Sequence, residues 1–554
     1  MDDGAPINIS SYLSQMADIQ PHKRAVVFPA GRDHQGRVAY AHLTFRQLDR
    51  ESDCLAHGLE QNGISRGTRT VLMVMPSIDF FVLTYALFKT GAVPVVVDPG
   101  MGIRRMLRCL EQSQPEAFIG IPKAHLIRRL FPRYFKTIDV AITVGRRWLW
   151  GGLTLKDVYQ RPWEAFPAAQ TTADEIAALL FTTGSTGPAK GVVYTHGVFD
   201  AQVRHIRSHF NITAEEIDLP TFPLFALFDP ALGMTAVIPD MDPTKPAFVQ
   251  PEKIIEAAEN QGVTNMFASP ALLDRVGSYG KAQGIKLPSF KRVISAGAPV
   301  YPDNLEQFSY LLSEEAEIHT PYGATEAVPL LSIGSHEILS ETRLLSEQGY
   351  GLCVGRPLAG LEVRIINISD DAIGTWDDGL CVADGDIGEI VAKGDLVTRQ
   401  YYRNTRADLL AKIADGEDVW HRMGDLGWRD SKGRMWFCGR KDHRVVSENE
   451  TLFTIPCEAI FNTHPRVARS ALIGVGQRPN QVPVICIELK KDRGGYRKKA
   501  IRAELLQLAG EHALTREIDT ILFHHRFPVD IRHNAKIFRE KLAKWAEKKV
   551  KVIA

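Results

Sequence analysis

Short, strongly apolar runs alternate with amphipathic segments over about the first 330 residues of this chain. The apolar runs are rich in β-branched residues, as in residues 70–75 (TVLMVM), 93–98 (VPVVVD), 117–121 (AFIGI) and 177–183 (AALLFTT). Between them lie segments such as 197–210, in which apolar residues recur near helical spacing. Apolar strands that alternate with helices are typical of parallel sheets with helices on both faces. The pattern therefore predicts an α/β fold with doubly wound sheets.

Short strands separated by turn residues dominate after about residue 350. Residues 361–366, 388–394 and 433–439 are examples, and we expect them to form a small distorted barrel. The changes of pattern predict a large N-terminal domain over residues 1–438, with sheet subdomains over about 1–345 and a barrel-like subdomain over about 346–438. A short connection at 439–442 (GRKD) would lead to an α+β C-terminal domain at 443–554.

The composition is that of a large enzyme with balanced charge. Sixty-six basic residues face 65 acidic ones, so nothing in the net charge of +1 points to a nucleic-acid partner. The seven cysteines show no CxxC spacing, which argues against a structural zinc or a disulfide framework. Charged residues and Pro94 interrupt the apolar stretch 78–97, which predicts a helix and a strand rather than a membrane span. The N-terminus lacks a secretory signal, and we expect a soluble, cytoplasmic protein.

The loop LLFTTGSTGPAKG, residues 179–191, has the composition of a phosphate-binding loop. It follows an apolar strand, and open α/β sheets bind ligands at the carboxyl ends of their strands. Its glycines permit close backbone approach, its hydroxyls donate hydrogen bonds, and Lys190 supplies a positive charge. Ala189 and Gly191 flank that lysine, so the loop is not a Walker A motif.

This order of residues resembles the signature loop of the adenylate-forming superfamily, which includes acyl-CoA ligases, luciferases and the adenylation domains of peptide synthetases. Further segments resemble the other motifs of that superfamily in the same order: 89–100 (KTGAVPVVVDPG), 295–300 (SAGAPV), 320–326 (TPYGATE), 421–427 (HRMGDLG), 439–442 (GRKD) and 527–540 (FPVDIRHNAKIFRE). The resemblance covers essentially the whole chain and implies that the chain uses ATP and Mg²⁺.

The resemblance also implies roles for individual residues. Tyr322 would stack on adenine, Thr325 would contact the α-phosphate, and Glu326 would hold Mg²⁺, for which carboxylate and phosphate oxygens are usual ligands. Asp425 would bind the ribose hydroxyls with help from Arg440. The full set implied to bind the nucleotide is Thr182, Thr183, Gly184, Ser185, Thr186, Gly187, Lys190, Ala296, Gly297, Ala298, Pro299, Tyr322, Gly323, Ala324, Thr325, Asp425 and Arg440.

The same resemblance assigns the C-terminal domain the role of a mobile lid. Asp442 would be the hinge, and Lys536 would enter the active site and act in catalysis together with Thr325 and Glu326. An ammonium group there can neutralise the negative charge that develops on the phosphoryl oxygens during carboxylate attack.

Two segments depart from the superfamily pattern. Residues 443–458 lack the Gly and Lys that help shape the pantetheine tunnel of CoA ligases. The aromatic or histidine gate of the superfamily's acyl pocket would fall within residues 222–233 (FPLFALFDPALG). No His occurs there, so Phe225 and Phe228 are the candidates for the gate, or they are ordinary core residues.

Residues 219–243 and 527–546 resemble one subgroup, the olefin β-lactone synthetases. That resemblance implies a 2-alkyl-3-hydroxy fatty acid as substrate: its carboxylate would be adenylated, and its own 3-hydroxyl would then close a four-membered lactone without CoA. A fatty acyl-CoA ligase and a catalytically silent nucleotide-binding scaffold are the alternatives. The base for the hydroxyl proton stays open among His196, His421, His443 and His533.

Two basic, partly apolar segments could form interaction surfaces: residues 123–150, which interleave basic and aromatic residues, and the predicted amphipathic helix 537–551. For both we favour solvated surface over contact with a membrane or an acidic partner. The subgroup resemblance makes docking to other olefin-pathway enzymes the alternative.

Overall fold

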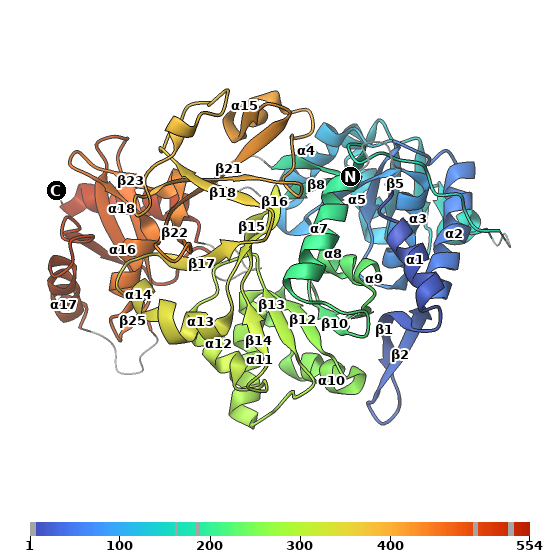
Figure 1. Cartoon of the computed structure of the whole chain (residues 1–554), viewed down its shortest axis with the longest axis horizontal. Helices are drawn as coiled ribbons and strands as arrows, with labels where there is room; N and C mark the ends of the chain where they lie inside the picture. The colour runs from blue at the N-terminus through green and yellow to red at the C-terminus, as the bar shows by residue number, and fades with distance from the viewer. Residues whose placement is uncertain (1–6, 161–163, 183–188, 491–496, 530–536, 554) are drawn as a thin grey trace.

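The computed structural model describes residues 7–160, 164–182, 189–490, 497–529 and 537–553 (Figure 1). Its first sheet has the order β7-β6-β5-β3-β4-β8-β9. The strands are β3 (Arg69–Met73), β4 (Val93–Val97), β5 (Ala117–Gly120), β6 (Val140–Thr143), β7 (Leu153–Thr154), β8 (Ile176–Thr182) and β9 (Lys190–Thr195). All described neighbours are parallel except β8 and β9, which form an antiparallel pair.

Helices cover both faces of the first sheet, because successive side chains along a strand point to opposite faces. Leu72 packs with α2 (Phe45–Gln61) and α3 (Ile78–Thr90), whereas Val71 packs with α4 (Ile103–Ser113), α5 (Pro122–Leu130) and the 3₁₀ turn η2 (Pro132–Phe135). The doubly wound arrangement predicted from the apolar strands is therefore confirmed.

The second sheet has the order β14-β13-β12-β10-β11-β1-β2. Its strands are β1 (Arg24–Arg32), β2 (Val38–Thr44), β10 (Ile217–Pro220), β11 (Thr235–Val237), β12 (Asn265–Ala268), β13 (Arg292–Ser295) and β14 (Glu317–His319). One face packs on α10 (Pro251–Gln261), α11 (Pro270–Gln283) and α12 (Pro302–Ser309). The other face packs on α7 (His196–His209) and α9 (Phe228–Leu232). Because α7 also packs on β8 and β9, it lies between the first and second sheets.

An antiparallel sheet of order β15-β16-β17-β22-β21-β19-β18, with β20 beside β21, adjoins these two sheets. Its strands are β15 (Tyr322–Ala324), β16 (Ala327–Ser332), β17 (Leu352–Pro357), β18 (Glu362–Ile366), β19 (Gly388–Lys393), β20 (Lys412–Asp415), β21 (Asp418–Arg429) and β22 (Met435–Arg440). In Figure 1 it occupies the middle of the molecule, between the blue and green sheets and the red C-terminal elements.

The C-terminal elements have a core of their own. β25 (Val467–Val475), β26 (Val482–Leu489) and β27 (Thr520–Phe523) form a sheet that packs against α16 (Thr454–Asn462), α17 (Lys498–Gly510) and α18 (Arg539–Ile553). Leu542 and Ala546 of α18 are fully buried in this core. The apolar side of the predicted amphipathic helix is therefore covered by the chain itself, and its basic side faces solvent.

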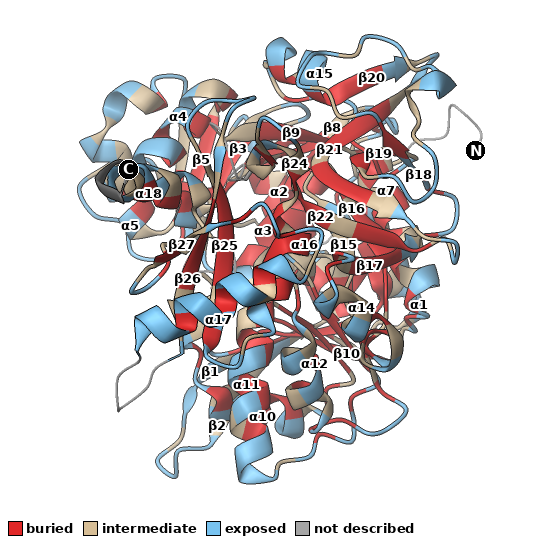
Figure 2. Cartoon of the chain, turned by 90° about the vertical axis from the view of Figure 1, so that its left-hand side faces the viewer, coloured by how far each residue is buried: buried red, intermediate tan, exposed pale blue. Residues whose placement is uncertain are grey.

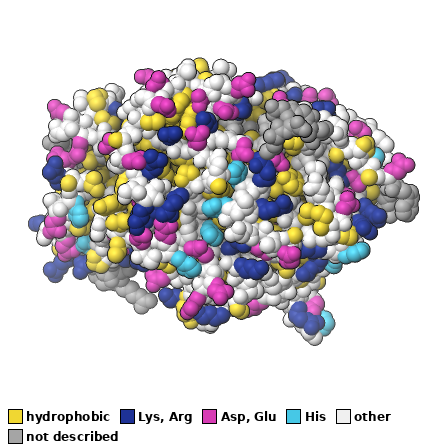
Figure 3. All heavy atoms as spheres, viewed as in Figure 1, with side chains coloured by type: hydrophobic (Ala, Val, Ile, Leu, Met, Phe, Trp, Pro, Cys, Tyr) yellow, Lys and Arg dark blue, Asp and Glu magenta, His cyan; other side chains and the backbone are white. Residues whose placement is uncertain are grey.

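Burial and charge follow the layered arrangement. Strands are largely buried and the outer helix faces are exposed (Figure 2). On the face shown in Figure 3, basic and acidic side chains are interspersed, as the balanced composition predicts. All seven cysteines lie among the described residues and are free thiols. In the part of the chain that the structure describes, every helix is too short or too polar to cross a membrane.

Candidate active site

The glycine-rich loop joins the two strands of a hairpin. Thr182 at the end of β8 pairs with Lys190 at the start of β9, and α7 begins only after β9. The helix predicted from residue 197 is confirmed by α7. The strand β9 before it was not predicted, although residues 191–195 are partly β-branched. Thr183, Gly184, Ser185, Thr186 and Gly187 lie outside the described residues.

Gly191 is needed for close packing within this hairpin. A Cβ at this position would lie 2.6 Å from the ring of Phe181, which is closer than two carbon atoms can approach. Residues 400–402 pass along the outer edge of β9. The backbone N–H of Tyr402 donates to the carbonyl oxygen of Gly191 over 2.7 Å, and Tyr401 forms a bridge with Val192.

This pairing brings Tyr401 to Glu326, the predicted magnesium ligand. The Tyr401 hydroxyl donates a hydrogen bond of 2.5 Å to Oε1 of Glu326. The Nζ atoms of Lys190 and Lys412 lie 4.7 and 5.7 Å from the centroid of the Tyr401 ring. Lys412 donates to the carbonyl oxygen of Thr398, whose N–H donates to the carbonyl oxygen of Glu326 over 2.9 Å. One carboxylate and two ammonium groups thus surround one tyrosine.

The electrostatics of this cluster suit phosphate and a divalent cation. Burial, and then the charge of Glu326, raises the pKa of Tyr401, so its hydroxyl stays protonated and donates. Burial lowers the pKa of Lys412 to about 8, while Glu326 acts in the opposite direction. Lys190 can attract phosphate oxygens, and the Glu326 carboxylate is the hard oxygen donor that Mg²⁺ prefers. These residues therefore fit the ATP and Mg²⁺ implied by the sequence.

A second cluster joins three of the predicted nucleotide-binding residues. Asp425 on β21 and Arg440 on β22 are partners in the sheet register, and Nη1 of Arg440 donates to Oδ1 of Asp425 over 2.8 Å. The Tyr322 hydroxyl donates to Oδ2 of the same carboxylate over 2.6 Å. Burial, and then Asp425, raises the pKa of Tyr322, so this hydroxyl also remains a donor. The carboxylate is buried, oriented by two partners and able to accept further hydrogen bonds from hydroxyl groups.

Gly424, beside Asp425, has a left-handed backbone with φ of 66°, which favours glycine. A Cβ there would lie 3.3 Å from Nη2 of Arg440, so glycine also keeps space for the guanidinium. The charge of Asp425 is the main cause that raises the pKa of Arg440, and the charge of Glu326 adds to it more weakly.

The predicted adenine-lining segment follows the carboxyl end of β13. Gly297 has a left-handed φ of 91°, and Ala296, Ala298 and Pro299 are half-buried around it. Ala296 packs against a hydrophobic cluster that contains residues from α7, α9, β12 and β13. The small residues therefore lie where the second sheet meets this cluster.

The two candidate substrate residues belong to that same cluster. Phe225 stacks on Phe267 with ring centroids 3.8 Å apart and an angle of 16°. The ring centroid of Phe228 lies 6.1 Å from that of Phe199 on α7. The ring centroid of Phe199 lies 4.9 Å from that of Tyr194 on β9. Both candidates are half-buried, next to the segment predicted to line adenine.

Tyr194 connects this aromatic cluster to the TPYGATE segment. Its hydroxyl donates to the carbonyl oxygen of Thr325 over 2.6 Å. Gly323 in the same segment passes close to the next strand, because a Cβ there would overlap the carbonyl oxygen of Ala327. Tyr194 therefore joins the aromatic cluster directly to Thr325 and, through the next residue, to Glu326.

The predicted hinge residue, Asp442, lies between a contact to the antiparallel sheet and contacts to the C-terminal region. The Nζ atom of Lys441 lies 3.0 Å from Oε1 of Glu389 on β19. Arg478 of the C-terminal region donates to the carbonyl oxygens of Asp442 and Arg444 over 2.6 and 2.9 Å. Asp442 itself lies in a 3₁₀ turn, Lys441–His443. Lys536, the predicted catalytic lysine, lies outside the described residues.

The histidines considered as bases have structural contacts. Nδ1 of His196 accepts from the N–H of Ile9 over 3.2 Å, and burial lowers its pKa to about 4. Burial also lowers the pKa of His421, whose ring lies 3.2 Å from the carbonyl oxygen of Ala411. His443 faces Glu540 at 3.4 Å, and His533 lies outside the described residues. Neither His196 nor His421 is suited to accept a proton near neutral pH.

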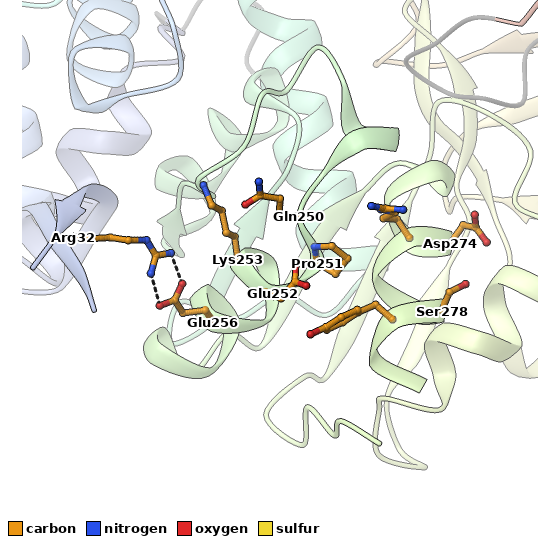
Figure 4. Close-up of a pocket in the computed structure, with 10 residues that line it drawn as sticks. Arg32, Gln250, Pro251, Glu252, Lys253, Glu256, Asp274 and Ser278 are labelled. Atoms are coloured by element: carbon orange, nitrogen blue, oxygen red, sulfur yellow. Dashed lines mark hydrogen bonds and ion pairs between the residues drawn. The ribbon is translucent and has the colours of Figure 1, made fainter. Parts of the chain in front are cut away.

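A separate pocket between α10 and α11 does not resemble an acyl site. Figure 4 shows Arg32 of β1 paired with Glu256 of α10 at its edge, with distances of 3.0 and 2.6 Å. Lys253, Asp274 and other polar side chains line the rest of it. Such a charged, open lining does not suit a fatty acid chain.

Sequence reasoning missed Tyr401, Lys412 and Tyr194. Tyr401 and Lys412 are 75 and more positions from Glu326 in the chain, and no local pattern connects them with it. Tyr194 lies in the strand that the sequence interpretation did not identify. Only strand pairing places these side chains next to the predicted ligands.

Comparisons with known proteins agree with this geometry. The family model described as AMP-binding enzyme matches residues 13–402. The chain is 47% identical over 546 residues to an olefin beta-lactone synthetase of Xanthomonas campestris, covering 97% of both chains. It is also 47% identical over 549 residues to one of Stenotrophomonas maltophilia, covering 98% of both. Among solved structures, the amide bond synthetase McbA of Marinactinospora thermotolerans has a TM-score of 0.79 at 20% identity, covering 97% of this chain and 99% of that one.

Proposed function

We propose that this chain, which belongs to the AMP-binding, adenylate-forming enzymes, is an ATP-dependent β-lactone synthetase acting on 2-alkyl-3-hydroxy fatty acids. The observation that carries the proposal is the 47% identity, over nearly the whole length of both chains, to two olefin beta-lactone synthetases. The two clusters around Asp425 and Glu326 support it, because they supply what adenylation requires.

In the first step, a carboxylate oxygen of the hydroxy acid attacks the α-phosphorus of ATP. The bond from that phosphorus to the pyrophosphate oxygen breaks, which gives an acyl-adenylate and pyrophosphate. Asp425, held by Tyr322 and Arg440, would orient the ribose, and Lys190 would attract phosphate oxygens. Mg²⁺, held by Glu326, would supply further neutralisation of phosphate charge.

Lys536 is proposed to approach the α-phosphate from the C-terminal domain during this step, moved by a hinge at Asp442. The support for it is its place in the segment 527–540, which resembles the last motif of the superfamily. A positive charge that arrives only with the closed domain would stabilise the transition state more than the bound ATP.

In the second step, the 3-hydroxyl oxygen attacks the acyl carbonyl carbon. The bond between that carbon and the AMP oxygen breaks, the hydroxyl proton is released, and a four-membered lactone and AMP result. The nucleophile belongs to the substrate, so the protein needs only to hold a productive conformer and exclude water. Phe225 and Phe228, in the aromatic cluster beside Ala296, are proposed to perform both tasks.

The altered segment 443–458 supports a reaction without CoA. The decisive experiment incubates the protein with ATP, Mg²⁺ and a racemic 2-alkyl-3-hydroxy acid, with and without CoA, and identifies the products by mass spectrometry and NMR. We expect β-lactone, AMP and pyrophosphate in both cases. A thioester that forms only with CoA would instead identify an acyl-CoA ligase, and no product at all would indicate a silent scaffold.

A matched pair of variants makes the experiment specific. Lys536→Ala should form neither adenylate nor lactone while it still binds ATP, whereas Lys544→Ala, an exposed lysine of α18, should behave as the wild type. Normal adenylation by Lys536→Ala would show that the assignment of this lysine is wrong. We further propose that the protein works in the cytoplasm with a small-molecule lipid substrate, alongside other olefin-pathway enzymes.

A further inference from the structure

Large apolar side chains project into solvent from α5 and from residues 145–150. Leu126 and Leu130 lie one helical turn apart on α5 and are 46% and 64% exposed. Trp148 and Leu149 are 61% and 102% exposed. We refer to these four side chains as the apolar tip. Such residues are costly to leave in water unless they contact something else.

The four residues belong to one surface. The ring of His125 on the buried side of α5 stacks on Trp150, with centroids 5.6 Å apart and an angle of 3°. The ring of Trp148 lies 5.5 Å from that of Trp150. Leu126, next to His125, is therefore close to the segment that carries Trp148.

Basic side chains surround the apolar tip. Residues 103–150, which include α4, α5 and η2, contain ten Lys or Arg and three Asp or Glu, in a chain whose total charge is only +1. The exposed cations include Arg104, Arg105, Arg108, Lys123, Arg129, Arg133, Lys136, Arg146 and Arg147. Within the described parts of the chain, Arg147 alone among these has an acidic partner, Asp157 at 3.9 Å.

We propose that this surface docks on an anionic phospholipid membrane. Tryptophan and leucine side chains that project from a basic surface can enter the boundary between headgroups and acyl chains, while the surrounding cations contact lipid phosphates. Each Lys or Arg near an anionic membrane strengthens the binding of the protein to it. Long basic side chains can also lie along apolar surface and keep their charged ends in water. An acidic protein partner would satisfy the charges but would not bury the apolar tip.

The docked surface lies on the side of the molecule that carries the active site. Residues 145–150 follow β6, and the glycine-rich loop follows the end of β8. Both strands point the same way, because every pair between them in the first sheet is parallel. Four strand spacings separate them, or about 19 Å. A membrane bound at the apolar tip would therefore lie near the loop edge of the sheet. The docking itself does not depend on the proposed reaction.

The test is co-sedimentation of the full chain with vesicles of pure phosphatidylcholine and of phosphatidylcholine mixed with phosphatidylglycerol. We expect binding to the mixed vesicles, much weaker binding to the neutral ones, and loss of binding at high salt. Trp148→Ser/Leu149→Ser should weaken binding to mixed vesicles at least tenfold. Arg129→Glu/Arg146→Glu should reduce it to the level seen with neutral vesicles.

Matched controls separate this surface from general effects. Leu344→Ser removes a leucine on α14 (Arg343–Glu347) that is 64% exposed, as Leu130 is. Lys281→Glu/Lys499→Glu reverses two exposed charges, one on α11 and one on α17. Both should bind as the wild type, and all variants should keep the wild-type circular dichroism and ATP binding. Wild-type protein that ignores both vesicle types, or tip variants that bind normally, would overturn the proposal. Loss of a co-purifying protein from the tip variants without vesicle binding would assign the surface to a protein partner instead.

Discussion

Tyr401 fixes the position of the carboxylate that we propose as a magnesium ligand. Glu326 is an ordinary flexible carboxylate, but the Tyr401 hydroxyl holds Oε1 at 2.5 Å, and the Glu326 backbone is tied to Thr398. A hydrogen bond to a charged group contributes about 1.5–3 kcal/mol. Lys190 lies over the same ring, so the lysine and the carboxylate both contact this tyrosine.

The corresponding prediction concerns Tyr401→Phe. The variant keeps the ring beside Lys190 but frees the Glu326 carboxylate, so the adenylation rate should fall roughly tenfold and the Mg²⁺ concentration for half-maximal rate should rise. Pyrophosphate release at varied Mg²⁺ measures both. Tyr402→Phe, at the neighbouring tyrosine, should leave the Mg²⁺ dependence unchanged. An unaltered Mg²⁺ requirement in Tyr401→Phe would show that this hydrogen bond does not position a magnesium ligand.

At the scale of elements, a pair of buried carboxyl groups joins α9 to β10. Asp229 of α9 and Asp218 of β10 are 3% and 2% exposed and share a hydrogen bond. Asn265 of β12 donates a second hydrogen bond to Asp218. Burial raises the pKa of Asp218 to about 7, although hydrogen bonds with Asn265 and Asp229 act in the opposite direction. Burial, and then the charge of Asp218, raises the pKa of Asp229 well above its ordinary value. The pair therefore holds a proton near neutral pH, and α9, which carries Phe228, depends on it.

This arrangement predicts a specific pH dependence. The folded-state pKa values lie above the ordinary 3.8, so between about pH 4 and 7 the folded protein retains protons that the unfolded chain releases. The contribution of the pair to the free energy of unfolding is thus complete at low pH and is lost as pH rises through about 7.

The variant Asp229→Asn tests this contribution, because an amide can donate to Asp218 without a shared proton. We expect its free energy of unfolding to depend less on pH, and to exceed that of the wild type by on the order of 1–3 kcal/mol at about pH 8. Urea unfolding at a series of pH values measures it. Asp386→Asn, an exposed control, should parallel the wild type. Parallel curves for Asp229→Asn and the wild type would show that the pair does not share a proton.

At the scale of the whole molecule, the C-terminal region packs closely on the antiparallel sheet at Gly439. Gly439 of β22 has a left-handed φ of 119°, and a Cβ there would overlap Oγ1 of Thr454 on α16. Beyond this point the chain passes through the turn that contains Asp442, where Arg478 binds the backbone from the C-terminal side. The movement proposed for this domain would have to open this close contact.

Gly439→Ala should therefore loosen the C-terminal domain. The new methyl group displaces Thr454, so small-angle X-ray scattering should give a larger radius of gyration and adenylation should slow, while ATP binding remains. Gly433→Ala is a matched control, because Gly433 also has a positive φ of 73° but no atom within 4 Å of the added Cβ. Equal scattering from the two variants would show that Gly439 does not control the domain contact.

The sequence alone determined the features that arise from local physics. Strand and helix periods predicted β3, β4, β5, β8 and α7, because side-chain alternation and helical spacing are read within a few residues. The order of small and polar residues in the glycine-rich loop and in TPYGATE indicated nucleotide chemistry and the superfamily. Those predictions needed no knowledge of which segments meet in space.

Only the tertiary structure decided which side chains meet and which faces are covered. Tyr401 reaches Glu326 because residues 400–402 pair with β9, more than 200 positions earlier in the chain. The basic amphipathic helix α18 covers its apolar side on the C-terminal sheet, whereas Trp148 and Leu149 remain exposed in an equally basic segment. Both segments have similar local patterns, so the sequence treats them alike. Burial depends on packing between distant segments, and that is why only the folded chain distinguishes them.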